Sequence, residues 1–100
     1  MGARANIRMK YVDGDVCIYS HWGGEELRDV LKGALSKRMR WNDPPYLGRI
    51  IFCHVIAEDV LGENGFGLSP NPGEEEYKTI VVDMENQMVD DMSFELFVSS

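Results

Sequence analysis

The residues able to do nucleophilic or metal chemistry are two cysteines and two histidines: Cys17, His21, Cys53 and His54. A thiolate needs its base within about 3 Å. Cys17 and His21 fall four residues apart on one predicted strand, and that spacing spans about 13 Å. Cys53 and His54 are neighbours on a predicted helix, so their side chains diverge by about 100°. The spacing disfavours a Cys–His catalytic pair, and we expect Cys53 to be a small core residue.

The same four side chains do not form a metal-binding pattern. They lack the C-x₂₋₄-C or H-x₃₋₅-H spacing of a structural zinc site, so we expect neither a metal nor another cofactor. His54 falls on the inner side of its helix, where a hydrogen-bonded core histidine is the expected state. Gly23 and Gly24 precede a helix, but the longer glycine pattern of a nucleotide-binding loop is absent.

Residues 6–21 predict a β-hairpin that folds at Asp13-Gly14, a strong two-residue turn signal. In this register Tyr11 pairs with Val16. Both strands place their apolar residues on one face, as a half-buried antiparallel pair requires. The opposite, polar face offers an alternative site for a small enzyme or a ligand-binding protein, made of Arg8, Lys10, Tyr19 and His21.

Two helices are predicted to cover the apolar face. Leucines recur at helical spacing in residues 25–39. Residues 44–61 form the most apolar run, with Asp43 at the N-cap position and Pro44 in the first turn. We expect this second helix to form the centre of the core and to be covered on several sides.

The C-terminal part predicts further strands around a surface loop at residues 69–76. Residues 77–84 are rich in β-branched side chains, and residues 88–98 alternate in polarity. Asp90-Asp91 interrupts the last strand and indicates a bulge or an edge. The chain as a whole, residues 1–100, predicts a single α+β domain: an antiparallel sheet of two hairpins with two helices packed on one face, in the order ββααβββ.

The charges are divided between the two halves of the chain. Residues 1–50 carry nine Lys or Arg and six Asp or Glu, a net charge of +3, whereas residues 51–100 carry one Lys and eleven acids, a net charge of −10. The total of −7 argues against direct nucleic-acid binding, which needs clustered Lys and Arg. No apolar run is long enough for a membrane span. Two distant cysteines without an export signal favour the cytoplasm.

Two segments, IYSHWGGEELRDVLKGAL and RWNDPPYLGRIIFCHVIAEDVLGENGFGLS, resemble a group of small proteins encoded by phages and prophages. In that group an HWGG turn, a W-[ND]-D-x-x-Y-L-x-R-I-I-F segment and a glycine-rich segment recur in this order. The match spans residues 12–83. It implies a phage origin and a shared fold, without a settled biochemical role.

Taken together, these patterns favour a binding protein over an enzyme. Our first hypothesis is a phage-encoded accessory or anti-defence protein in the host cytoplasm, whose acidic half binds a basic host protein such as a nucleic-acid-processing enzyme. The candidate binding residues are the clustered acids and a Trp–Arg pair of the kind common in recognition hot spots: Glu74, Glu75, Glu76, Asp90, Asp91, Trp41 and Arg40. Trp41 has a second interpretation, as a plug of the corner between the two helices. Besides the sheet-face alternative, self-association as a homodimer through a sheet edge or an exposed helix stripe stays open.

Overall fold

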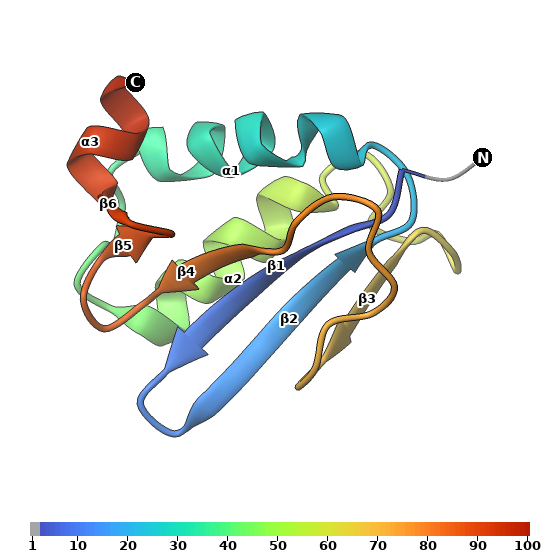
Figure 1. The fold of residues 1–100 in the computed structure, drawn as a ribbon, viewed down its shortest axis with the longest axis horizontal. Coiled ribbons are helices and arrows are strands. Elements are labelled where there is room, and N and C mark those ends of the chain that lie inside the picture. Colours follow the sequence, from blue (N-terminus) through green and yellow to red (C-terminus); the bar gives the residue numbers. More distant parts are fainter. Residues whose placement is uncertain (1–2) are drawn as a thin grey trace.

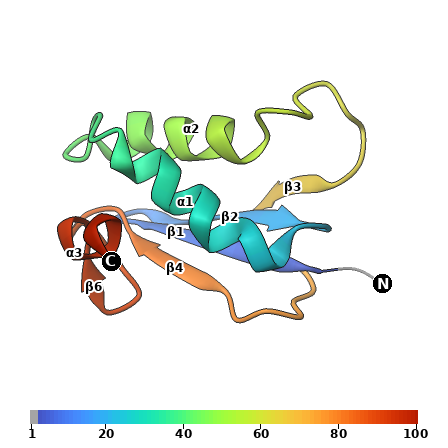
Figure 2. The same ribbon diagram turned by 90° about the horizontal axis from the view of Figure 1, so that it is seen from above.

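The structure is a computed structural model that describes residues 3–100. A six-stranded mixed sheet in the order β3-β2-β1-β4-β5-β6 carries helices α1 and α2 on one face (Figures 1 and 2). The predicted α+β class is confirmed. The sheet differs from the prediction in containing a parallel pair of strands, and a third helix follows the last strand. In chain order the elements are β1 Ala5–Tyr11, β2 Gly14–Ser20, the 3₁₀ turn η1 Gly24–Glu26, α1 Leu27–Ser36, α2 Pro44–Val55, β3 Phe66–Ser69, β4 Ile80–Asp83, β5 Met88–Val89, β6 Met92–Ser93 and α3 Phe94–Ser99.

The hairpin of β1 and β2 forms as predicted, but with a different turn. Tyr11 pairs with Gly14, so the turn is Val12-Asp13 and not Asp13-Gly14. The register is therefore shifted by two residues from the predicted one. Because side chains alternate with a period of two, this shift returns every side chain to the face that was predicted. The apolar face accordingly lies in the core.

The helices α1 and α2 pack against each other and bury one face each. α1 buries three leucines at helical spacing. α2 buries Leu47 and Ile51, while much of its opposite side is exposed, so the prediction that this helix is covered on several sides is wrong. It ends at Val55, earlier than predicted. Asp43 stands at the N-cap without a side-chain hydrogen bond.

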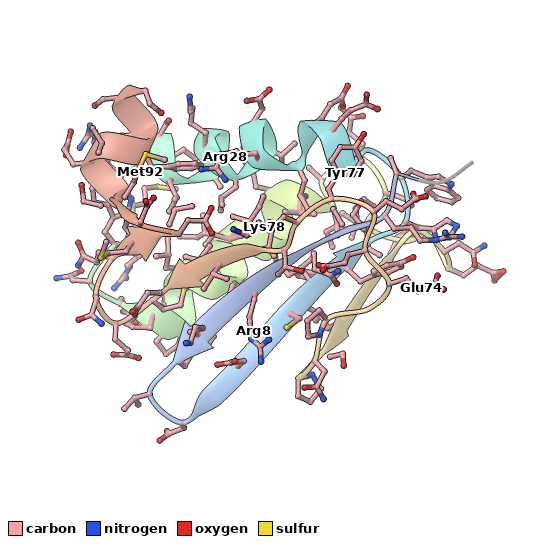
Figure 3. All side chains as sticks on the ribbon, in the orientation of Figure 1. Arg8, Arg28, Glu74, Tyr77, Lys78 and Met92 are labelled. Carbon is pink, nitrogen blue, oxygen red and sulfur yellow. The ribbon has the colours of Figure 1, made fainter. Side chains whose placement is uncertain are left out.

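The strand β4 lies parallel to β1, whereas only antiparallel pairs were predicted. The connection from β3 runs across the face of the sheet opposite the helices (Figure 2). The buried side chain of Asn6 holds this crossover segment, residues 70–79. Its amide group donates to the carbonyls of Gly73 and Glu74, and its oxygen accepts the Gly73 N–H at 2.9 Å. The polar face of the hairpin is therefore covered at this end, and it remains uncovered around Arg8 (Figure 3).

The predicted long strand over residues 88–98 is wrong. The chain forms the two-residue strands β5 and β6, joined by a turn at Asp90-Asp91, and continues into α3. The Ser93 hydroxyl caps this helix by accepting a backbone N–H of the first turn at 3.1 Å. Phe94 and Phe97 are both buried, and their separation of three residues places them on one side of a helix.

Candidate functional site

Three of the predicted acidic binding residues are engaged in contacts within the fold. Glu74 forms an ion pair with Arg4 Nε at 3.2 Å, and Glu76 accepts a hydrogen bond from the Arg4 backbone N–H. Glu75 accepts a hydrogen bond from the Thr79 hydroxyl. Glu74 and Glu76 thus help to hold the crossover segment beside the start of β1. The three do not form a free cluster of charges.

Asp90 and Asp91 form the β5–β6 turn and have different surroundings. Asp90 has φ +53°, and its Oδ1 accepts the Val81 N–H at 3.1 Å. Its Oδ2 pairs with Arg28 at 2.9 Å, and Figure 3 shows Arg28 extending from α1 towards this part of the chain. The Asp91 side chain is exposed. Asp90 is therefore a structural residue, while Asp91 presents its charge to solvent.

Trp41 fills the corner between α1 and α2. Its indole N–H donates to the Leu35 carbonyl at 3.0 Å, and its ring packs edge-on against Phe94, with 5.3 Å between the centroids. The Arg38 guanidinium covers the ring at 5.1 Å and makes two hydrogen bonds to Glu95. These contacts support the interpretation of Trp41 as a corner plug rather than a presented recognition residue.

Beside this corner, a groove of 640 Å³ runs between α2 and the end of α1. The α2 groove is lined by Lys37, Met39, Arg40, Tyr46, Arg49, Ile50, Cys53, His54 and Ala57. Arg40 stacks over the Tyr46 ring at 4.5 Å. Cys53 is exposed, so the prediction that it is a core residue is wrong. His54 is half-buried and packs on Gly33, where an added methyl carbon would meet its Nε2 at 3.0 Å.

The predicted sheet-face site is divided into two parts. Arg8 forms an ion pair with Asp15 at 2.7 Å, and this hydrogen bond raises the pKa of Arg8 above its ordinary value. Lys10, further towards the hairpin turn, is exposed. Tyr19 and His21 lie at the other end of the face, where the Tyr19 hydroxyl and His21 Nδ1 are 2.7 Å apart and hydrogen-bonded. The four residues therefore do not converge on one site.

Tyr19 and His21 instead line a cleft of 440 Å³ with the exposed side chain of Trp22. The walls of this Trp22 cleft are Tyr19, His21, Trp22, Glu63, Asn64, Gly65 and Phe66. The indole is 55% exposed and meets the His21 ring edge-on, with 5.3 Å between centroids. Tyr19 lies near the end of β2, His21 directly follows that strand, and the neighbouring edge strand β3 begins with Phe66.

Gly65 allows the indole to lie against the chain that precedes β3. Its φ is +101°, and its carbonyl accepts the His21 backbone N–H at 2.8 Å. An added methyl carbon would come within 2.7 Å of the Trp22 ring and 3.6 Å of the Asp59 carboxylate. Any larger residue would therefore displace the indole, in addition to straining the backbone.

The surroundings of Trp22 are acidic. Glu63 lines the cleft, Asp59 lies against Gly65, and Glu26 lines a smaller hollow that Trp22 also lines. Within residues 3–100 none of these three carboxylates forms an ion pair, and no Lys or Arg lines either hollow. Sequence patterns did not indicate this site because its acids come from two separate segments, η1 and the α2–β3 connection, and only the fold brings them around one tryptophan.

Comparison with known proteins gives no indication of function, so the proposal below rests on the geometry of the site. No protein-family model matches the chain, and neither curated proteins nor solved structures give a significant match. In the part of the chain that the structure describes, no three His, Cys, Asp or Glu side chains are placed to hold a metal ion. None of the helices in residues 3–100 combines the length and apolar character that crossing a bilayer requires.

Proposed function

We propose that this protein is a protein-binding module that recognises a basic segment of its partner through the Trp22 cleft. One observation carries the proposal: an exposed tryptophan stands among three carboxylates without a neighbouring Lys or Arg in the described chain. A large aromatic side chain left in water is otherwise unfavourable, and tryptophan is the residue most enriched in binding hot spots.

The chemistry of the cleft suits a lysine or arginine side chain. A cation placed over an indole face is attracted by the ring quadrupole, by about 0.5–1 kcal/mol at an exposed site. Glu63 and Asp59 would add charge attraction at the rim of the same cleft. The net charge of −7 would speed the encounter with a basic surface at low salt.

The partner that we propose is a basic protein of a host cell. The resemblance of the HWGG and W-[ND]-D-x-x-Y-L-x-R-I-I-F segments to phage-encoded proteins supports an accessory or anti-defence role in the host cytoplasm. Enzymes that process nucleic acids are suitable partners because their surfaces are basic. The negatively charged surface of this protein would compete with nucleic acid for the basic surface of such an enzyme.

The proposal is tested by the affinity of a short, labelled, lysine-rich peptide, measured by fluorescence anisotropy at low salt. Glu63→Lys should weaken binding about fivefold or more, since it removes an attraction worth up to about 1 kcal/mol and replaces it with a repulsion between like charges. Trp22→Ala should weaken it further. Asp91→Lys is the matched control, because it makes the same charge change at an exposed position in the β5–β6 turn.

The outcomes separate a local site from general attraction. We expect Asp91→Lys to change affinity by less than twofold and an acidic peptide of equal length not to bind. If Glu63→Lys and Asp91→Lys weaken binding equally, only the net charge matters and the cleft is not the site. If the lysine-rich peptide does not bind the unaltered protein at all, the proposal is refuted.

A further inference from the structure

The outer side of α2 carries an exposed stripe that nothing in the described chain covers. Tyr46, Arg49, Ile50, Cys53 and Ala57 follow one another at helical spacing and line the α2 groove. Tyr46 is 53% exposed, and Leu61, a few residues beyond the end of the helix, is 96% exposed. Both are large apolar side chains: Tyr46 begins the stripe, and Leu61 follows it in the chain.

The charges along this side of α2 are ordered. The groove is lined by three cations, Lys37, Arg40 and Arg49, of which Arg40 is paired with Asp43 at 3.2 Å, and its lining includes no acid. An adjoining hollow is lined by Glu26, Glu58 and Asp59 and includes no Lys or Arg. The two hollows share His54 and Ala57, so the basic and the acidic surfaces lie side by side.

We propose that two copies of this chain form a symmetric dimer in which their α2 helices pair antiparallel. A surface with adjacent basic and acidic halves is complementary to itself after a half-turn, which is the requirement of a two-fold interface. With the axis near Cys53, Arg49 of one copy faces Glu58 of the other. Tyr46 of one copy then approaches Leu61 of the other, so that apolar contacts flank the charged ones.

A second copy fits this surface better than an unrelated acidic partner does. Complementary charges and the matching apolar residues at both ends are all present on one chain, in the order that an antiparallel pair needs. Standard interfaces bury about 800 Å² per partner, a modest share of the 6019 Å² exposed by this protein. The acidic hollow shares Glu26 and Asp59 with the surroundings of Trp22. The test alters only Arg49, Cys53 and Glu58 and leaves Trp22 and Glu63 intact, so failure of the dimer and failure of the proposed function are distinguishable.

Charge exchange across the axis tests the dimer by sedimentation velocity over a concentration series. Arg49→Glu should shift the protein to monomer, and so should Glu58→Arg. The double variant Arg49→Glu/Glu58→Arg should recover the dimer, because it restores each contact with the signs exchanged. Lys78→Glu is the control for net charge, since Lys78 is exposed just before β4 and outside the α2 groove; it should sediment like the unaltered protein.

Cross-linking gives a second readout of the same geometry. A short bismaleimide should join two copies through Cys53, because this thiol is exposed near the proposed axis, whereas Cys17 is buried. Cys53→Ser and Arg49→Glu should both abolish the linked species. The proposal is overturned if the unaltered protein stays monomeric at millimolar concentration, if Arg49→Glu remains a dimer, or if both single variants dissociate and the double variant does not reassociate.

Discussion

Removing the Asp90 side chain should destabilise the protein strongly, although sequence patterns marked this residue as a candidate binding charge. Asp90 accepts the Val81 N–H, pairs with Arg28 and occupies a left-handed backbone conformation. A hydrogen bond to a charged acceptor contributes about 1.5–3 kcal/mol, and its half-exposed position favours the low end. Placing alanine in the left-handed conformation costs about 1 kcal/mol more. We therefore expect Asp90→Ala to lose about 2–3 kcal/mol.

Two further variants separate these contributions. Asp90→Asn keeps an acceptor and tolerates the left-handed conformation, so it should lose only the ion pair, about 0.2–1 kcal/mol. Asp91→Ala, next to it in the same turn, should stay within about 0.5 kcal/mol of the unaltered protein. Urea unfolding followed by circular dichroism measures all three. A loss below about 1 kcal/mol for Asp90→Ala, or an equal loss for Asp91→Ala, would refute the structural role.

Three other predictions concern the core, the thiols and the acid limit of stability. Ile51→Ala should cost about 2–5 kcal/mol in urea, because the side chain is fully buried; a loss under about 1 kcal/mol would mean that α2 is not anchored there. A maleimide should label the exposed Cys53 rapidly and Cys17, whose pKa is raised by burial, only after unfolding; equal rates would contradict this. Hydrogen bonds from Asn86 lower the pKa of Asp83 below its ordinary value of 3.8. The ionised Asp83 therefore stabilises the fold above about pH 4, and this stabilisation is lost as the pH falls through the lower pKa of the folded state. Asp83→Asn should therefore flatten the loss of stability below about pH 4 in acid titrations, and an unchanged acid limb would rule this out.

The hairpin illustrates how far local patterns determine the fold. Alternating polarity predicts which face of β1 and β2 is buried, and it does so in any register shifted by two residues. It therefore cannot distinguish a turn at Asp13-Gly14 from one at Val12-Asp13. The parallel pairing of β4 with β1 was also beyond local patterns, because it depends on where the crossover segment is held by Asn6, far away in the sequence.

The C-terminal helix was predictable in part, but its signal was short. Ser93 is a good N-cap, Glu95 stands in the first turn, and Phe94 and Phe97 are spaced for a helix. Alternation of Phe94 with Leu96 favoured a strand instead. The helix is only six residues long, so its packing on α1 rather than its own propensity decides the outcome.

The candidate site could not be predicted because its parts are separated in sequence. Clustering along the chain marked Glu74 and Asp90, whose carboxylates turn out to be paired with nearby cations. The acids around Trp22 that form no ion pair in the described chain come from η1 and from the α2–β3 connection, and only the fold brings these two segments together. Charge clustering in sequence and free charge on the surface are thus different quantities, because folding neutralises some clusters and assembles others.

The most direct test of the central claim compares the two tryptophan side chains in one experiment. Each indole N–H gives its own signal in a ¹H–¹⁵N spectrum, and the two rings differ in setting: Trp22 is exposed in the cleft, while the Trp41 N–H is bonded to the Leu35 carbonyl. On titration with the lysine-rich peptide, the Trp22 signal should move together with the backbone signals of Glu63 and Gly65, and the Trp41 signal should stay in place. A shift confined to residues 74–76 and 90–91, with the Trp22 signal unchanged, would contradict the account.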